Sequence, residues 1–107
     1  MPDWRGRIYC SALSEGRVMI YVEPSIVGRR EITVFVAADS LEEMFAFGAR
    51  LGWEDWYITD PSVYGFVAYD VTERMRVAAL AAGARERSCM EVEKRATRLV
   101  PEWMALM

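Results

Sequence analysis

The 107-residue sequence contains no histidine, and its two cysteines, Cys10 and Cys89, lie far apart in the chain. Histidine has the unperturbed pKa nearest neutrality and is the commonest metal ligand. Without it, no histidine base can activate a nucleophile, and the cysteines do not have the spacing of a zinc site. We therefore expect no catalytic residue, no metal site and no cofactor, and a non-catalytic function is favoured.

The sequence also lacks an apolar run of the ~18 residues that a membrane span requires, and its beginning does not resemble a signal peptide. We expect no contact with a membrane and a cytoplasmic location. The isolated cysteines agree with a reducing compartment, while a disulfide between Cys10 and Cys89 is the open alternative. The length and an apolar content of 53% predict one globular domain over residues 1–107.

Basic residues are scarce in the middle of the chain. The net charge is −3, yet residues 39–72 carry Arg50 against seven acidic residues. Residues 73–107 are richer in arginine, but Glu86, Glu91 and Glu93 interrupt that basic stretch. Nucleic-acid binding, which needs a basic surface, is therefore not expected.

The first part of the chain is typical of β-structure. Arg7–Leu13 and Arg17–Glu23 flank the turn residues Ser14–Gly16, which predicts a hairpin. Glu31–Ala38 is a continuous β-branched and apolar run, as in a strand that is buried on both faces, and we expect it to be central.

Three later segments are predicted to be helices by capping residues at their starts. Ser40 with Glu43 forms a capping-box pattern before a helix that ends at Gly52. Thr72 precedes a helix over Glu73–Ala82, and Ser88 with Glu91 opens a helix that runs to about Leu99.

Further strands are expected between these helices. Trp53–Thr59 and Tyr64–Val71 are predicted to pair through a turn at Asp60–Ser62, and a short strand is an option at Ala84–Arg87. The overall prediction is a single small α/β domain, with a mixed sheet of about five strands and three helices packed on it. Residues 1–16 would add a strand or arm, and residues 101–107 an apolar C-terminal tail.

Several short blocks occur in an order that is found in a known family. They are Tyr21–Glu23, Ile32–Asp39, Glu43–Phe47, Leu51–Gly52, Ala68–Asp70 and Val77–Ala84. In these blocks the chain resembles domain of unknown function 4031, a family of small proteins in bacteria and their phages. The resemblance covers roughly residues 18–95.

The differences from this family are concentrated at polar positions. Family members carry histidine where this chain has Phe35, Phe45 and Ala68, the last within a His-Tyr-Asp motif. Tyr69 and Asp70 of that motif are retained. The resemblance implies that any site built on those histidines is lost in this chain.

Aromatic and acidic residues without a basic residue are concentrated in one segment, which we propose to be a partner-binding surface for a basic protein. Its candidate residues are Trp53, Glu54, Asp55, Trp56, Asp60 and Tyr64. The favoured alternative is that Trp53, Tyr57 and Phe66, with or without Tyr64, are core residues on alternating strand positions and the acidic residues are merely solvated. In a mixed case, Trp56 and Tyr64 are the exposed interface anchors.

A second candidate site would bind a small molecule or nucleotide. Arg29 and Arg30 follow Gly28 and are suited to an anion, and they would act together with Tyr69 and Asp70. No phosphate-binding glycine motif supports this reading. A solvated turn at the arginine pair is the favoured alternative.

The C-terminal tail is unusually apolar for a chain end. Trp103, Met104 and Leu106 either fold back onto the core or contact a second copy, which would make the protein a homodimer.

The functional hypothesis from the sequence is a phage or prophage accessory protein that binds a protein partner. Its most concrete form is inhibition of a host defence complex, as anti-CRISPR proteins do. The alternative is a small-molecule or nucleotide-binding domain, or an enzyme, of the same α/β family.

Overall fold

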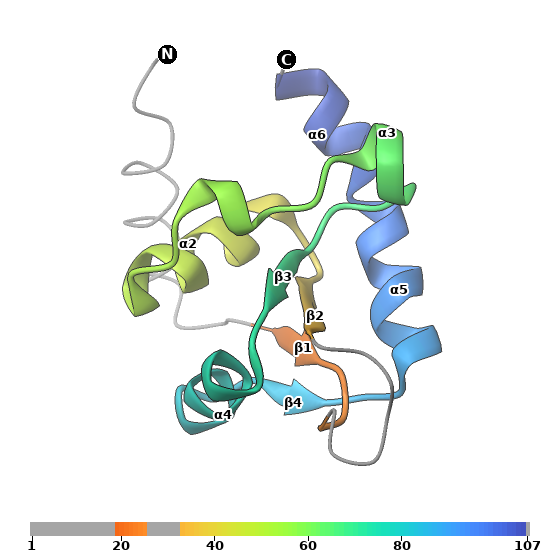
Figure 1. The fold of residues 1–107 in the computed structure, drawn as a ribbon. Helices are drawn as coiled ribbons and strands as arrows, with labels where there is room; N and C mark the ends of the chain where they lie inside the picture. Colours follow the sequence, from red (N-terminus) through yellow and green to blue (C-terminus); the bar gives the residue numbers. More distant parts are fainter. Residues whose placement is uncertain (1–18, 26–32, 107) are drawn as a thin grey trace.

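The structure, a computed structural model, describes residues 19–25 and 33–106. The predicted arm over residues 1–16, Cys10, Arg29 and Arg30 lie outside the described residues. The elements in chain order are β1 (Ile20–Val22), β2 (Val34–Ala38), α2 (Leu41–Leu51), the 3-10 helix η1 (Asp55–Tyr57), α3 (Pro61–Tyr64), β3 (Tyr69–Val71), α4 (Glu73–Ala81), β4 (Arg85–Glu86), α5 (Cys89–Arg98) and α6 (Val100–Leu106) (Figure 1).

The strands form one sheet in the order β3-β2-β1-β4. β2 is antiparallel to both β1 and β3, whereas β4 runs parallel to β1, so the sheet is mixed as predicted. The prediction that the strand ending at Ala38 is central is confirmed, and so is the short strand after Ala84. β3 is an edge strand of this sheet.

Helices cover both faces of the sheet (Figure 1). Successive strand residues point to opposite faces, so alternate residues enter two separate cores. Val34 and Val36 pack with Met44 and Phe45 of α2 on the face that also carries α4. Tyr21, Ala37 and Ala68 pack with Val92 and Ala96 of α5 on the other face. The result is a three-layer α/β/α domain.

The capping residues identified in the sequence begin their helices as predicted. Ser40 Oγ accepts a hydrogen bond from Glu43 N at 3.2 Å, and Thr72 and Ser88 make the equivalent bonds at α4 and α5. Gly52 ends α2 with φ of 76°, a left-handed conformation that glycine adopts at little cost. No helix in the described part of the chain has the length and apolarity needed to cross a bilayer.

Of the predicted strand pair, the first strand is wrong and the second, Tyr64–Val71, is confirmed only over Tyr69–Val71. Residues after Trp53 form η1, and only Ile58 makes a single bridge, to Tyr69. Asp60 begins a one-turn helix instead of a hairpin turn, because its Oδ1 accepts hydrogen bonds from Ser62 N and Oγ at 2.9 and 2.8 Å. Pro61 fits the first helical turn, which needs no N–H donor. The described sheet therefore has four strands rather than about five.

The chain end is also different from the predicted tail, because residues 100–106 form the additional helix α6. Glu102 Oε2 accepts a hydrogen bond from Leu41 N at 2.9 Å and so helps to cap α2. Trp103 packs on Phe45 with ring centroids 6.2 Å apart, which is the predicted folding back onto the core. Met104 and Leu106 stay exposed, and their predicted contact with a second copy remains a prediction.

Candidate functional site

A small pocket lies where the η1–α3 segment runs beside the edge strand β3. Its volume is about 220 Å³. The residues that line it are Trp56, Tyr57, Ile58, Thr59, Asp60, Tyr64 and Asp70. We call this cavity the β3-edge pocket.

Two carboxylates and no described basic residue line the β3-edge pocket. Asp70 Oδ1 is buried and accepts no hydrogen bond from the described residues. Hydrogen bonds from the Ser62 hydroxyl and backbone N–H lower the pKa of Asp60, so this exposed carboxyl is ionised at neutral pH. The described residues contain no group of three His, Cys, Asp or Glu side chains arranged to hold a metal ion. With two carboxylates in its lining, the pocket is suited to a positively charged group.

Aromatic rings form the sides of the pocket. Trp56 stacks on Tyr57 with centroids 3.9 Å apart and an interplanar angle of 26°. Tyr64 makes an edge contact with Phe35 at 6.0 Å, and Phe35 in turn packs on Phe66 at 4.9 Å. Phe35 is the cross-strand partner of Asp70, so this aromatic group is adjacent to the carboxylate.

One threonine fixes the pocket segment to the body of the domain. Thr59 Oγ1 donates to Phe66 O at 2.7 Å and accepts from Ala68 N at 3.1 Å. Thr59 N also donates to Ala68 O at 2.9 Å, and the neighbouring Ile58 bridges to Tyr69. These buried hydrogen bonds fix the segment that carries Thr59 against the residues at and before β3, although this segment is not a regular strand.

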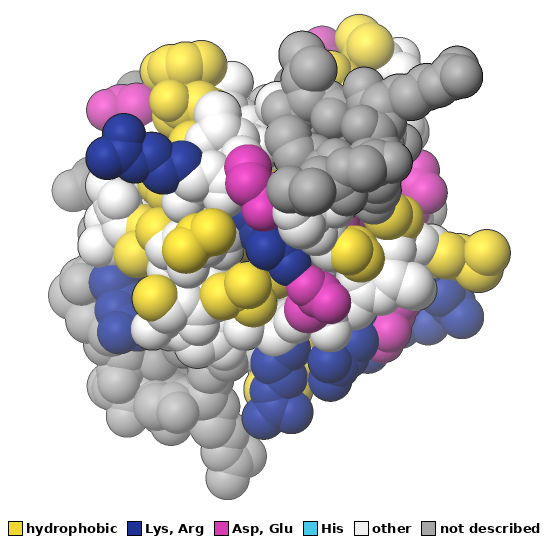
Figure 2. Space-filling model, turned by 60° about the horizontal axis from the view of Figure 1, so that its bottom comes forward, with side chains coloured by type: hydrophobic (Ala, Val, Ile, Leu, Met, Phe, Trp, Pro, Cys, Tyr) yellow, Lys and Arg dark blue, Asp and Glu magenta, His cyan; other side chains and the backbone are white. Residues whose placement is uncertain are grey.

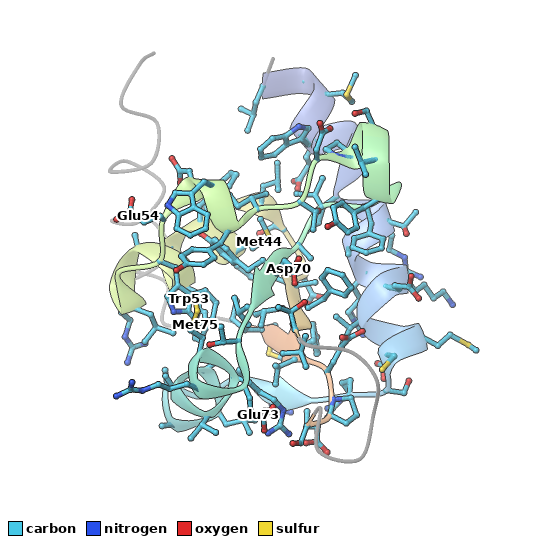
Figure 3. The ribbon with its side chains drawn as sticks, in the orientation of Figure 1. Met44, Trp53, Glu54, Asp70, Glu73 and Met75 are labelled. Carbon is cyan, nitrogen blue, oxygen red and sulfur yellow. The ribbon has the colours of Figure 1, made fainter. Side chains whose placement is uncertain are left out.

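The predicted partner-binding residues do not all face the same way. Trp53 is 6% exposed and makes edge contacts with Phe47 and Tyr69, so it belongs to the core. Figure 3 shows Glu54 at the outer edge beyond α2, away from Asp70 on β3. Asp55 is exposed in η1 but does not line the pocket.

The other three predicted partner-binding residues, Trp56, Asp60 and Tyr64, do line the pocket. Trp56 is 74% exposed and Tyr64 46%. Their exposure, together with the burial of Trp53, corresponds to the mixed case that the sequence left open.

The residues predicted to bind a small molecule are likewise not all brought to one place. Tyr69 is fully buried, and its ring faces Gly48 on α2 rather than the pocket. Asp70, the next residue, points to the opposite face and lines the pocket. The arginine pair that would complete this set is among the residues that are not described.

Sequence reasoning missed three pocket residues, Tyr57, Ile58 and Thr59. The sequence favours a core position for Tyr57 and places Ile58 and Thr59 at the end of a regular strand. A threonine just before Asp-Pro-Ser could have indicated an anchor, because Asp at the start of a helix and Pro in its first turn stop a preceding strand. No local pattern could have revealed that Phe35 lies beside Asp70.

A second hollow lies along α5. It has a volume of about 330 Å³ and is lined by Ser88, Met90, Glu91, Lys94, Arg95 and Arg98. Arg95 is already engaged, since it pairs with Asp39 and Glu91 and its guanidinium lies 4.1 Å from the Tyr21 ring centroid. Figure 2, with the α4–β4 end brought forward, shows basic side chains with acidic ones between them. Basic and acidic side chains therefore lie next to one another on the face that Figure 2 shows.

The fold and the pocket define a small three-layer α/β domain with an acidic, aromatic cavity at a sheet edge. The chain belongs to the family described as "Protein of unknown function (DUF4031)", whose sequence pattern matches residues 20–99. No curated protein and no solved structure matches the chain. The matched residues include all four described strands and the whole β3-edge pocket. The family description assigns no activity, so function must be argued from the site.

Proposed function

We propose that this protein acts without catalysis, by binding a basic protein partner through the surface around the β3-edge pocket. The observation that carries the proposal is the exposure of three large side chains beside the pocket. Trp56 is 74% exposed, Val63 75% and Tyr64 46%. We call these three residues, with Asp55 and Asp60 beside them, the acidic aromatic surface.

Exposed aromatic side chains are typical anchors of protein interfaces. Tryptophan and tyrosine are enriched among the residues that contribute most binding energy, and they cluster near the centre of an interface. In a free protein an exposed tryptophan leaves a large apolar area in water, so covering it stabilises a complex. The stacked Trp56–Tyr57 pair presents such an area on a fixed segment.

Charge favours a basic partner. Between Arg50 and Arg74 the sequence contains no basic residue, while Glu54, Asp55 and Asp60 are exposed. Acidic surfaces attract basic ones over several ångströms and speed their association. A nucleic acid, which is itself negatively charged, would be repelled by this surface.

The concrete version of the proposal is a phage or prophage accessory protein that inhibits a host defence complex. Complexes that handle nucleic acid have basic grooves, and an acidic surface of this kind occludes such a groove. The resemblance in sequence to small phage-linked proteins supports this version, and the acidic aromatic surface supplies the physical means.

The test is affinity capture from a host bacterial lysate with matched variants. The tagged protein, Trp56→Ala and Met90→Ala are compared by quantitative mass spectrometry of the bound proteins. Met90 is 79% exposed on α5 and is the control for loss of an exposed apolar side chain elsewhere. We expect Trp56→Ala to weaken capture of the partner by at least ~30-fold, as for an interface anchor worth about 2 kcal/mol, and Met90→Ala to leave it unchanged.

Equal capture by the wild-type protein and Trp56→Ala would contradict the proposal. Thermal denaturation of each variant accompanies the assay, because a substitution at so exposed a position should leave stability within about 0.5 kcal/mol. A bound partner that is released by nuclease treatment would also count against direct protein contact.

A further inference from the structure

We infer that the β3-edge pocket receives the guanidinium group of an arginine from the partner, with Asp70 as its main acceptor. This inference rests on the proposed function and makes it specific: it names the side chain that the site recognises. It is carried by the charge, the aromatic sides and the rigidity of the pocket.

The first argument is the unsatisfied carboxylate. Asp70 Oδ1 is buried, yet no described residue donates a hydrogen bond to it. A buried acceptor without a donor destabilises the folded protein, and more so when it is charged. Asp60 adds a second negative charge at the pocket, and no described basic residue lines it. A cation in the pocket that pairs with the Asp70 carboxylate would stabilise this poorly solvated group.

The second argument is the aromatic surround, which selects arginine over lysine. A guanidinium is planar, stacks on aromatic rings and is less strongly hydrated than an ammonium group. Trp56 and Tyr57 form a stacked pair in the lining of the pocket, and Tyr64 contributes a ring supported by Phe35. A guanidinium between these rings keeps its edge N–H groups free to donate to a carboxylate.

The third argument is preorganisation. The pocket holds about 220 Å³, which is small for a drug-sized ligand and sufficient for one side-chain head group. The Thr59 hydrogen bonds to Phe66 and Ala68 fix the segment before any ligand arrives. A site that is already ordered spends less binding energy on its own immobilisation.

The test is a nuclear magnetic resonance titration of the whole isotope-labelled protein with three probes. N-acetylarginine amide is the expected ligand, N-acetyllysine amide tests the preference for a planar cation, and N-acetylcitrulline amide is the neutral analogue of nearly the same shape. We expect arginine amide to shift the resonances of Trp56, Thr59 and Asp70, with an affinity in the millimolar range on the order of a single-group contact. Lysine amide should bind several-fold more weakly, and citrulline amide should cause no saturable shift.

Variants separate a specific contact from general charge attraction. Asp70→Asn keeps the side-chain shape and removes the charge, and we expect it to weaken arginine amide binding at least tenfold. Asp55→Asn removes the same charge at an exposed position that does not line the pocket, and it should change the affinity less than twofold. Trp56→Ala removes a pocket-lining ring that is 74% exposed, so it should weaken binding without unfolding the domain. It replaces Asp70→Asn as the test if that variant does not fold.

Citrulline amide binding as strongly as arginine amide would overturn the inference. Unchanged affinity in Asp70→Asn that retains its folded spectrum would overturn it as well. If Trp56→Ala abolishes partner capture while arginine amide does not bind, the inference fails and the proposed function stands. If arginine amide binds through Asp70 while partner capture does not depend on Trp56, the inference holds and the proposed function fails.

Discussion

Replacing Gly48 with alanine should destabilise the domain, although the same change in the middle of a helix normally stabilises. Gly48 is buried in α2 and faces β3 across the core. A Cβ atom at this position would lie 1.9 Å from Tyr69 Oη and 2.3 Å from Tyr69 Cζ. Ordinary contacts are longer than 3 Å, so the tyrosine ring would have to move by more than ~1 Å.

The size of the effect follows from two opposing contributions. Helix propensity favours alanine over glycine by about 1 kcal/mol. Overpacking a close-packed core typically costs about 1–3 kcal/mol, and the upper end applies here because Tyr69 is fully buried and is held by an edge contact with Trp53 at 5.1 Å. We therefore expect Gly48→Ala to lower the free energy of unfolding by about 2 kcal/mol. For a domain of this size the melting temperature should fall by roughly 10 °C.

Urea denaturation and thermal melting, both followed by circular dichroism, measure this effect. Ala49→Gly on the next residue is the control, and it should cost about 1 kcal/mol from propensity alone. The clash should also depend on the ring, so Gly48→Ala should be tolerated better in a Tyr69→Leu background, which a double-mutant cycle detects. A higher melting temperature for Gly48→Ala would refute the reasoning, since it would mean that the helix and β3 are not packed as described.

Two further predictions concern buried polar groups. Arg76 Nε donates to Glu23 O at 2.9 Å, and its Nη2 pairs with Glu86. Arg76→Met should therefore lower the free energy of unfolding by about 2 kcal/mol, measured by urea denaturation. An effect no larger than that of Arg74→Met, at an exposed position, would contradict this prediction. The pKa of Tyr21 is raised above 10.0, chiefly by burial and also by its hydrogen bond to Asp39. The stability that this raised pKa contributes is present below the unfolded-state pKa of tyrosine and is lost as pH rises through the folded-state pKa of Tyr21. Tyr21→Phe should therefore flatten the loss of stability above about pH 10. An unchanged alkaline stability profile in Tyr21→Phe would count against this prediction.

The helices show how much of the fold can be read from local sequence. Ser40, Thr72 and Ser88 each start the helix that was predicted, because an N-cap depends on residues within one turn. The central strand is equally local, since its β-branched and apolar run favours a buried strand. α6 was missed because its position depends on two distant contacts, those of Trp103 with Phe45 and of Glu102 with Leu41 N.

The pocket segment shows the opposite case, in which local pattern misleads. Trp53–Thr59 is rich in aromatic and β-branched residues, which favours a strand. Yet Asp60 and Pro61 favour a helix start, and the resulting turn leaves only Ile58 in contact with the sheet. Thr59 favours the irregular conformation over a strand through its buried hydrogen bonds to residues seven and nine positions away. The sequence of the segment alone does not predict these bonds.

The same irregularity creates the candidate site. A regular strand beside β3 would extend the sheet, and it would point successive side chains to opposite faces. Because η1 and α3 replace it, Trp56, Asp60 and Tyr64 converge beside Asp70 and leave a cavity at the sheet edge. Local rules fail here because the residues that line the pocket are held by contacts across the fold, and such failures are expected where structure serves binding rather than stability. The pocket at this departure from regular structure is therefore the place where mutation should separate function from folding.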